Sequence, residues 1–452
     1  MSELYEMTIV EAAEAIRTEN MSPVDLMECL LRRSRDMDSH LRVWETLDEE
    51  LALDSARARQ LEIERNGPQG ALHGIPIGVK DIFNTKNLRT TSGSPIYENF
   101  VPDFDSTAVG LLRKAGAIVM GKTITTEFAS FDPPPTRNPW NHEHTPGGSS
   151  SGSAVGVAAR MFPAALGSQT SGSVLRPASY TGVIGVKPTF GRISRYGVTP
   201  VASSLDTIGY FTRSVEDAAL VLEVISGHDK NDPESSREPV DGYTEAVASV
   251  GLAPRIGIVR GFFSNMADDE VSTHTENVVD NLAFAGADIE EAVLISDFDT
   301  LLEAHRVVMN VESAVSREKE FASRPDDFSP NIRGSIESGM SASGTGYVKA
   351  QQTRASFRRE ITELAGRFDI LLTPSTLTQA PRDLTTTGDP SFQAPWTTAG
   401  LPTISIPSGL TKAGLPLGIQ LAASPFAEAR LLSSALWCVN SLDVSLGTPT
   451  DV

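Results

Sequence analysis

Short apolar runs alternate with amphipathic stretches along most of this chain. Residues 75–79 form an apolar run that ends at Lys80, a pattern typical of a buried strand. The same reasoning predicts strands at 117–120, 184–186, 256–259, 369–372, 401–406 and 417–421, and helices at 106–115, 215–226, 271–284 and 345–367. Alternation of strands and helices predicts a layered α/β fold.

The first 65 residues are expected to be helical. Ser22 followed by Pro23 is typical of an N-cap with a proline in the first turn. The chain of 452 residues has room for two or three domains. The best candidate for a linker, residues 229–238, is short, so one large domain with a surface loop there and a pair of domains both stay open.

Composition narrows the class of protein. Hydrophobic residues make up 40% of the chain, which excludes wholesale disorder. The formal charge of −20 argues against a nucleic-acid-binding surface. No run of 18 apolar residues exists, so we expect no membrane-spanning helix. Two cysteines, Cys29 and Cys438, are too few for a disulfide framework, and the reducing cytoplasm is the expected compartment.

Residues 145–173, which read TPGGSSSGSAVGVAARMFPAALGSQTSGS, carry most of the chemical information. Thirteen of these 29 residues are Gly or Ser, but the apolar stretch 154–165 excludes a flexible linker. We expect two Ser/Gly-rich turns around a buried helix and strand. Small residues let the backbone N–H groups of such turns approach a ligand, and a serine there can serve as a nucleophile.

Several short motifs compete for this chemistry. Residues 116–123 fit a phosphate-binding loop, but their middle is the expected strand, and residues 316–319 fit S-x-x-K without its companion motifs. His142 and His144 stand alone, so no metal site is expected. Residues 148–152 fit the nucleophile elbow G-x-S-x-G around Ser150, which keeps an α/β-hydrolase-type esterase open as a minority alternative.

A lysine can replace histidine as the base of a serine nucleophile. Burial lowers the pKa of a lysine and makes a neutral amine available. Lys80 ends an apolar strand and is therefore a candidate for this role. Its alternative role is a structural salt bridge with the adjacent Asp81.

Five ordered blocks resemble the amidase signature family. They are GIPIGVKD at 74–81, GKT at 121–123, RNPWN at 137–141, TPGGSSSGS at 145–153 and GSQTSGSVLRPASYTGVIGVKPT at 167–189. Residues 191–197, 204–206, 401–409 and 414–418 are similar as well, so the resemblance runs from about residue 20 to 440. It implies a single large α/β/α domain over residues 1–452, with a mixed central β-sheet covered by helices on both faces and N-terminal helices 1–65 packed on the core.

The resemblance also implies a catalytic triad and an oxyanion hole. Lys80 matches the base, Ser149 the middle serine after a cis peptide bond, and Ser173 the nucleophile. Ser150 would only support them. The backbone N–H groups of Thr170, Ser171, Gly172 and Ser173 match the oxyanion hole.

This chain departs from the commonest family pattern at two places. It has Gln169 and Ser171 where many members have aspartate and glycine, and Arg176 stands three residues after Ser173 rather than two. Arg176 is expected either to bind a carboxylate or carbonyl of the substrate or to form a structural ion pair. The further candidates for substrate binding are Gln169, Tyr97, Phe131 and Trp396.

The leading functional hypothesis is a stand-alone hydrolase of C–N acyl bonds, acting on small or aryl amides and on carbamates, with ester cleavage as a side activity. It expects a small-molecule amide or carbamate substrate, no cofactor, no metal, no nucleic acid and no membrane, and leaves a homodimer open. The alternative is the glutaminase subunit of a tRNA-dependent amidotransferase, which residues 191–228 resemble. A non-catalytic binding protein is disfavoured because all three triad positions are filled.

Overall fold

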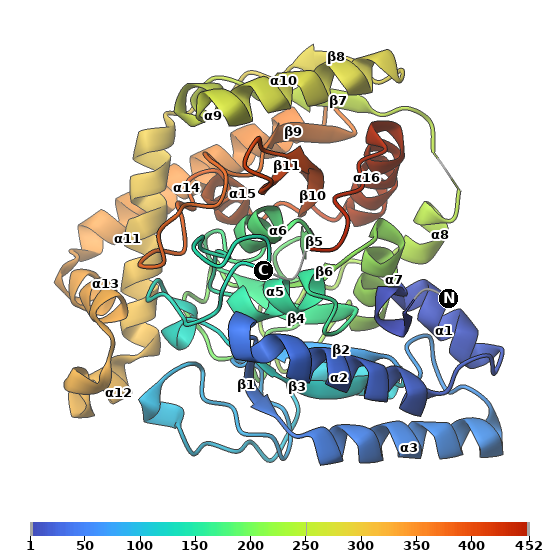
Figure 1. The fold of residues 1–452 in the computed structure, drawn as a ribbon. Coiled ribbons are helices and arrows are strands. Elements are labelled where there is room, and N and C mark those ends of the chain that lie inside the picture. Colours follow the sequence, from blue (N-terminus) through green and yellow to red (C-terminus); the bar gives the residue numbers. More distant parts are fainter. Residues whose placement is uncertain (1–2, 250, 450–452) are drawn as a thin grey trace.

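One mixed sheet organises the residues that a computed structural model describes, 3–249 and 251–449 (Figure 1). Its eleven strands follow the order β1-β3-β2-β4-β6-β5-β10-β11-β9-β7-β8. The strands are β1 (Trp44–Leu47), β2 (Pro76–Lys80), β3 (Ile118–Thr123), β4 (Ala164–Gln169), β5 (Ile184–Lys187), β6 (Thr207–Thr212), β7 (Arg255–Ile258), β8 (Asp288–Glu291), β9 (Ile370–Pro374), β10 (Thr403–Leu410) and β11 (Pro416–Ala422).

Parallel and antiparallel pairs are both present in this sheet. Strand β2 runs parallel to β3 and β4, and β7 runs parallel to β8 and β9. The pairs between these two groups are antiparallel, from β4 with β6 through to β11 with β9. Strand β2 is fully buried between two neighbours, which suits its continuous apolar sequence.

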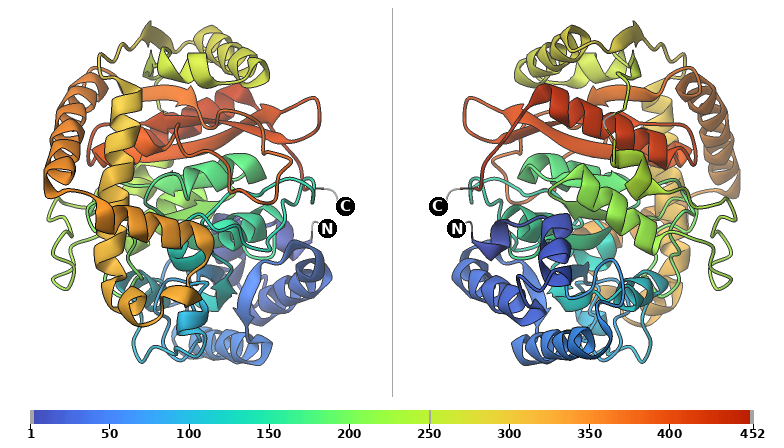
Figure 2. Two further views of the ribbon diagram at one scale, coloured as in Figure 1. Left: turned by 90° about the vertical axis from the view of Figure 1, so that its left-hand side faces the viewer. Right: turned by 90° about the vertical axis from the view of Figure 1, so that its right-hand side faces the viewer.

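Helices surround the sheet in the views of Figure 2. They are α1 (Ile9–Arg17), α2 (Pro23–Leu41), α3 (Glu49–Asn66), α4 (Thr107–Lys114), α5 (Ser151–Ala158), α6 (Leu175–Thr181), α7 (Val215–Ile225), α8 (Tyr243–Val247), α9 (Phe262–Met266), α10 (Asp269–Phe284), α11 (Phe298–Ser316), α12 (Glu318–Ser323), α13 (Pro330–Ser341), α14 (Gly344–Ala365), α15 (Ala394–Ala399) and α16 (Glu428–Leu442). Short 3₁₀ turns are η1 (Leu4–Glu6), η2 (Pro95–Tyr97), η3 (Glu127–Ala129) and η4 (Pro325–Asp327).

Two neighbouring residues of β6 show that helices cover both faces of the sheet. A Cβ placed on Gly209 would meet Val174, immediately before α6, whereas the hydroxyl of Tyr210 donates to the carbonyl of Ala218 in α7. Successive strand residues point to opposite faces, so α6 and α7 lie on opposite sides. This arrangement confirms the predicted α/β/α fold with a mixed central sheet.

Most predicted elements are present within a few residues of their expected bounds. Ser22 caps α2 with Pro23 in its first turn, as predicted, and its side chain accepts from the backbone of Asp25. The expectation that the first 65 residues are entirely helical is wrong, because β1 pairs with β3 at the sheet edge. Residues before and after 229–238 contribute strands to the same sheet. This stretch is therefore a loop that connects two parts of one sheet, and it does not link two separate sheets.

Candidate active site

Lys80 stands at the end of β2, the third strand from one edge of the sheet, and its side chain is fully buried. Its Nζ lies 2.7 Å from Ser149 Oγ and 2.9 Å from Ser168 Oγ. Burial lowers the pKa of Lys80 to about 7, although the negative charge of Asp206 acts in the opposite direction. A neutral amine is therefore accessible near neutral pH, as a lysine base requires.

Ser149 lies in the loop that leads from β3 into α5. The peptide bond between Gly148 and Ser149 is cis, as the resemblance implies. The backbone N–H of Thr126 donates to the carbonyl of Ser149 at 3.3 Å, and the Ser151 hydroxyl donates to the carbonyl of Gly147 at 2.7 Å. These contacts fix the loop on both sides of Ser149.

Ser150 has a different environment. Its hydroxyl is fully buried and lies 3.3 Å from both the backbone N and the carbonyl O of Ser168. The residues before it belong to a loop, whereas a nucleophile elbow requires a strand directly before the serine. The α/β-hydrolase alternative centred on Ser150 does not fit this fold.

Ser173 lies in the short segment between β4 and α6, and 8% of its surface is exposed. Among the residues that the structure describes, no hydrogen bond joins Ser173 to Ser149. Of the three triad residues, only Lys80 and Ser149 are directly hydrogen-bonded to each other. The side-chain oxygen of Gln169 accepts from the backbone N–H groups of Val174 at 2.8 Å and Leu175 at 3.0 Å. Gln169 therefore shapes this segment from within the core.

A cavity of about 570 Å³ opens beside Ser171. Its walls come from α11, α13 and the segments around Phe131 and Pro390, and include Leu302, His305, Met309, Asn331 and Ala394. Phe131, one of the candidates for substrate binding, lines this cavity. The cavity is the space next to the segment that carries Ser173.

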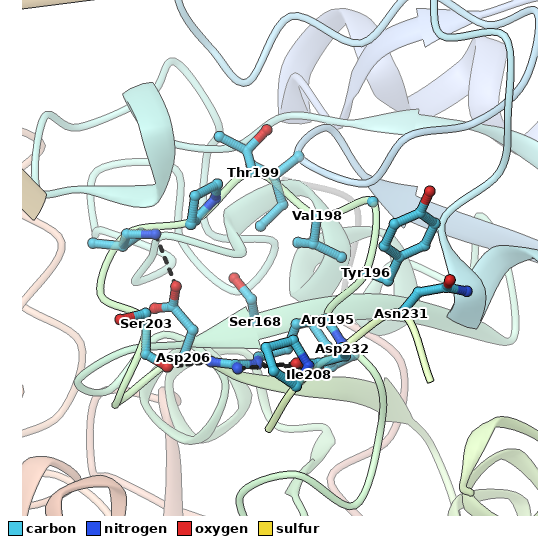
Figure 3. Close-up of a pocket in the computed structure, with 15 residues that line it drawn as sticks. Ser168, Arg195, Tyr196, Val198, Thr199, Ser203, Asp206, Ile208, Asn231 and Asp232 are labelled. Carbon is cyan, nitrogen blue, oxygen red and sulfur yellow. Dashed lines mark hydrogen bonds and ion pairs between the residues drawn. The ribbon is translucent and has the colours of Figure 1, made fainter. Parts of the chain in front are cut away.

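A second cavity of about 290 Å³ lies on the Ser168 side, and Ser168 projects into it (Figure 3). Asp206 also lines this cavity, and its carboxylate accepts from Thr170 Oγ1 at 2.5 Å and from the backbone of Val201 at 2.8 Å. Burial raises the pKa of Asp206, against the effect of these hydrogen bonds. Asp206 anchors the segment before Ser173 from this second side.

Arg176 forms no ion pair with any residue that the structure describes. Its Nη2 donates to the carbonyl of Gly148 at 2.8 Å and to Thr387 Oγ1 at 3.1 Å, while its Nε and Nη1 are buried without a partner. Burial lowers its pKa to about 10. Of its two expected roles, the structural ion pair is therefore absent.

Tyr97 and Trp396 are not among the residues that line the cavity beside Ser171. The hydroxyl of Tyr97 donates to Glu320 Oε1 at 2.5 Å. Trp396 is 1% exposed and stacks on Phe263, with 6.0 Å between the ring centroids. The structure places Trp396 in the core.

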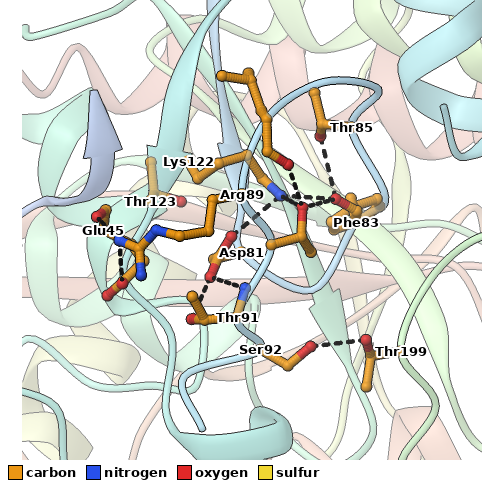
Figure 4. Close-up of polar contacts among 12 residues, drawn as sticks. Glu45, Asp81, Phe83, Thr85, Arg89, Thr91, Ser92, Lys122, Thr123 and Thr199 are labelled. Atoms are coloured by element: carbon orange, nitrogen blue, oxygen red, sulfur yellow. Dashed lines mark hydrogen bonds and ion pairs between the residues drawn. The ribbon is translucent and has the colours of Figure 1, made fainter. Parts of the chain in front are cut away.

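Lys122, the lysine of the sequence that fits a phosphate loop, lies within β3. It forms an ion pair with Asp81 at 3.1 Å and donates to the carbonyl of Phe83 at 2.7 Å (Figure 4). Its ammonium group is fully buried and has no access to a phosphate. The rejection of a nucleotide site there agrees with this geometry.

Sequence reasoning missed two polar contacts of the site. Ser168 stands within the quoted GSQTSGS motif, yet its contact with Lys80 depends on the pairing of β2 with β4. His305 stands in a long helix outside every motif, and its Nε2 lies 3.1 Å from Ser171 Oγ. Neither contact has a sequence pattern of its own.

Residues 3–249 and 251–449 are the part of the chain that the structure describes. These residues contain no group of three or more His, Cys, Asp and Glu side chains placed to hold a metal ion. None of their helices is long and apolar enough to cross a membrane.

The family model described as Amidase matches residues 25–432. The chain belongs to the amidase family. Among solved structures, the peptide amidase of Stenotrophomonas maltophilia is 28% identical, with a TM-score of 0.87 over 99% of both chains. A second amidase structure has 28% identity and a TM-score of 0.85, and covers 95% of this chain and 99% of that one. Family membership identifies the chain as a hydrolase of C–N bonds.

Full-length relatives narrow the place of this amidase within its family. The A subunit of glutamyl-tRNA(Gln) amidotransferase from Geobacter sp. (strain M21) is 36% identical over 96% of both chains. The corresponding protein of Pseudomonas fluorescens (strain Pf0-1) is 35% identical and covers 99% of this chain and all of its own.

These relatives correct two expectations. The hypothesis of a stand-alone hydrolase of small or aryl amides and carbamates is wrong, because the relatives favour the amidotransferase alternative. The expectation of a small-molecule substrate alone, without nucleic acid, is wrong for the same reason, since the relatives are subunits of an enzyme named for a tRNA. The net charge of −20 describes the surface of this chain alone, and it does not exclude a tRNA from an assembly that contains the chain.

Proposed function

We propose that this amidase is the glutamine-hydrolysing subunit of a tRNA-dependent amidotransferase. The observation that carries the proposal is the full-length similarity to amidotransferase subunits, at 36% identity over 96% of both chains. The contact of 2.7 Å between Lys80 Nζ and Ser149 Oγ supports a hydrolytic site in this chain. Two buried free cysteines, Cys29 and Cys438, agree with a reducing cytoplasm.

The proposed reaction begins with proton transfer through the two serines. Neutral Lys80 accepts a proton from Ser149, which accepts one from Ser173, and Ser173 Oγ forms a bond to the side-chain amide carbon of glutamine. The relay requires a hydrogen bond between Ser149 and Ser173 in the complex with glutamine, and catalytic hydrogen bonds that are long in a free enzyme often tighten when substrate binds. The small residues of segment 170–173 let their N–H groups approach the developing oxyanion.

The tetrahedral intermediate then releases ammonia. Protonated Ser149 returns a proton to the leaving nitrogen, the C–N bond breaks, and a glutamyl ester remains on Ser173. Water attacks this ester, its proton returns through Ser149, and glutamate leaves. Ammonia is the product that the partner subunits consume.

Arg176 is proposed to hold the α-carboxylate of glutamine. Its Nη1 is unpartnered, and a Cβ placed on Gly172, next to Ser173, would lie 3.3 Å from it. A buried guanidinium without a carboxylate gains most from an anionic ligand.

The test is reconstitution with the other amidotransferase subunits of the source organism, glutamyl-tRNA(Gln), ATP and L-glutamine. Expected are glutamate release and glutaminyl-tRNA formation that require the complete set, with Ser173→Ala abolishing both. Ammonium chloride supplied in place of glutamine separates loss of glutamine hydrolysis from loss of assembly, because the Ser173→Ala complex should still use it. Failure of the complete set to use glutamine, with Ser173 still reactive, would contradict the proposal.

A further inference from the structure

Ser171 is held through both its carbonyl and its hydroxyl. Its carbonyl accepts from Thr397 Oγ1 at 2.9 Å, and its hydroxyl lies 3.1 Å from His305 Nε2. Thr397 belongs to α15 and His305 to α11, so two separate helices hold the same residue. Ser171 stands two residues before Ser173.

The hydrogen bonds around His305 determine its tautomer. Its Nδ1 lies 2.8 Å from Thr398 Oγ1, and the Thr398 hydroxyl donates its single hydrogen to the carbonyl of Ala394 at 2.7 Å. Thr398 must therefore accept from His305 Nδ1–H. The lone pair of the neutral ring then lies on Nε2, which accepts from the Ser171 hydroxyl.

The protonation state of His305 keeps this direction fixed. The ring is 4% exposed, and burial lowers its pKa to about 3, with the positive charge of Arg354 acting the same way. Arg354 also donates from Nε to the carbonyl of Thr398 at 3.0 Å. His305 is consequently neutral at any pH where a lysine base operates. In its bond with Ser171, it therefore acts as the acceptor and never as the donor.

Gln169 joins the same network from the other end of the segment. Its Nε2 donates to Thr397 Oγ1 at 3.0 Å, and its Oε1 holds the N–H groups of Val174 and Leu175. Gln169 and Ser171 are the two positions at which this chain departs from the aspartate and glycine of the common pattern. The network therefore accounts for both departures together.

We propose that His305 is a positioning residue that acts through Ser171 to hold the oxyanion-hole segment in place for attack by Ser173. The inference rests on the proposed function, because it assumes Ser173 as the nucleophile. It adds a residue on α11 with a role in orienting backbone N–H groups. His305 reaches the reacting atoms only through Ser171.

The test measures how fast a small alkyl fluorophosphonate labels Ser173, by intact mass and peptide mapping. The probe does not depend on glutamine recognition. His305→Asn keeps an amide near Nδ1 but loses the contact with Ser171, whereas His305→Gln places an acceptor near Nε2. We expect Ser171→Ala and His305→Asn each to slow labelling about tenfold or more, since a misplacement of about 1 Å costs up to a hundredfold.

Two further variants measure the coupling. The double variant Ser171→Ala/His305→Asn should be no slower than either single variant, because both break the same bond. His305→Gln should recover most of the rate. All variants should keep the pH midpoint of the wild type, since His305 does not titrate in that range.

A matched control is His274→Asn, which breaks another histidine–serine bond, 2.8 Å from His274 Nε2 to Ser408 Oγ. It should label at the wild-type rate. Equal labelling of His305→Asn and wild type, or additive effects in the double variant, would overturn the inference. A rise in KM for glutamine with normal labelling would assign His305 to substrate contact and overturn it too. An unlabelled wild type would instead contradict Ser173 as nucleophile.

Discussion

Asp81 and Lys122 form an ion pair in the interior of the protein, with 3.1 Å between Oδ1 and Nζ and both side chains fully buried (Figure 4). Asp81 Oδ2 also accepts from the backbone and the hydroxyl of Thr91, at 2.7 and 2.6 Å. The carboxylate next to Lys80 in sequence is thus engaged by another lysine. Lys80 forms no ion pair with any described residue, and burial lowers its pKa to about 7.

Lys122→Met should destabilise the fold strongly. Removing one partner of a buried ion pair leaves the other charge without compensation, at a cost of about 3–5 kcal/mol in the free energy of unfolding. Chemical denaturation followed by circular dichroism measures this loss. The double variant Asp81→Asn/Lys122→Met should lose less than the two single variants added together, and strict additivity would show that the two side chains are not coupled.

The pKa of Lys80 predicts how activity depends on pH. The base is the neutral amine, so the labelling rate of Ser173 should rise with pH, pass its midpoint near the pKa of about 7, and level off above it. Lys80→Met should slow labelling by about a hundredfold or more and remove this midpoint. A variant that regains the wild-type rate at high pH would exclude Lys80 as the base.

Lys187 offers a matched control for this experiment. Burial lowers its pKa to about 7 as well, but its Nζ donates to the carbonyls of Pro188 and Leu401. Lys187→Met should leave the pH midpoint of labelling near 7, because this lysine contacts no serine of the site. If the midpoint of labelling moved in Lys187→Met, the titrating group would be Lys187 and not Lys80.

Lys80 should also make stability depend on pH. Its pKa lies below the ordinary value of 10.5 in the folded state, so between about 7 and 10.5 the unfolded chain binds more protons and stability rises with pH. Below that window the full penalty of burying an ammonium group remains. Lys80→Met should therefore raise the thermal midpoint more at pH 6 than at pH 10, and an equal shift at both would contradict the lowered pKa.

The sequence predicted the central strands well and the contacts between distant segments poorly. Residues 75–79 are apolar without interruption, and a strand buried on both faces needs that pattern. Strand β1 escaped prediction because it has only four residues between two helices and depends on pairing with β3. Propensity carries little information about so short an edge strand.

The candidate site shows the same division. Lys80 and Ser149 were found from motifs, and the structure places them 2.7 Å apart. The choice between two partners for Asp81 needed the structure, because only the pairing of β2 with β3 brings Lys122 within 3.1 Å of Asp81. His305 lies 134 residues from Ser171, in the middle of a helix, and only the packing of α11 against the site brings them together.

Arg176→Met should weaken glutamine binding by a larger factor than it slows the labelling of Ser173. The variant removes the unpartnered Nη1 proposed for the carboxylate, so KM for glutamine should rise about tenfold or more, the loss expected for a charged hydrogen bond. It also removes the donor to Gly148, so fluorophosphonate labelling should slow, but by a smaller factor. Labelling and glutamine turnover reduced by the same factor would exclude a carboxylate contact.

Gly172→Ala tests whether the segment before Ser173 tolerates any added atom. A Cβ there would lie 2.7 Å from Gln393 Oε1 and 3.2 Å from Pro390 Cβ, and Gln393 cannot swing away freely because its Nε2 donates to the carbonyl of Ser375. The segment must move instead, and labelling of Ser173 should slow by up to about a hundredfold.

Gly334→Ala is the control for Gly172→Ala, because Gly334 lines the same cavity from α13 and a Cβ there would meet no atom within 4 Å. It should label at the wild-type rate and gain up to about 1 kcal/mol of stability from the higher helix propensity of alanine. Slowed labelling in Gly172→Ala with normal labelling in Gly334→Ala would locate the effect in segment 170–173. Equal rates in both variants would show that the oxyanion-hole segment accommodates the methyl group, contrary to the packing described for it.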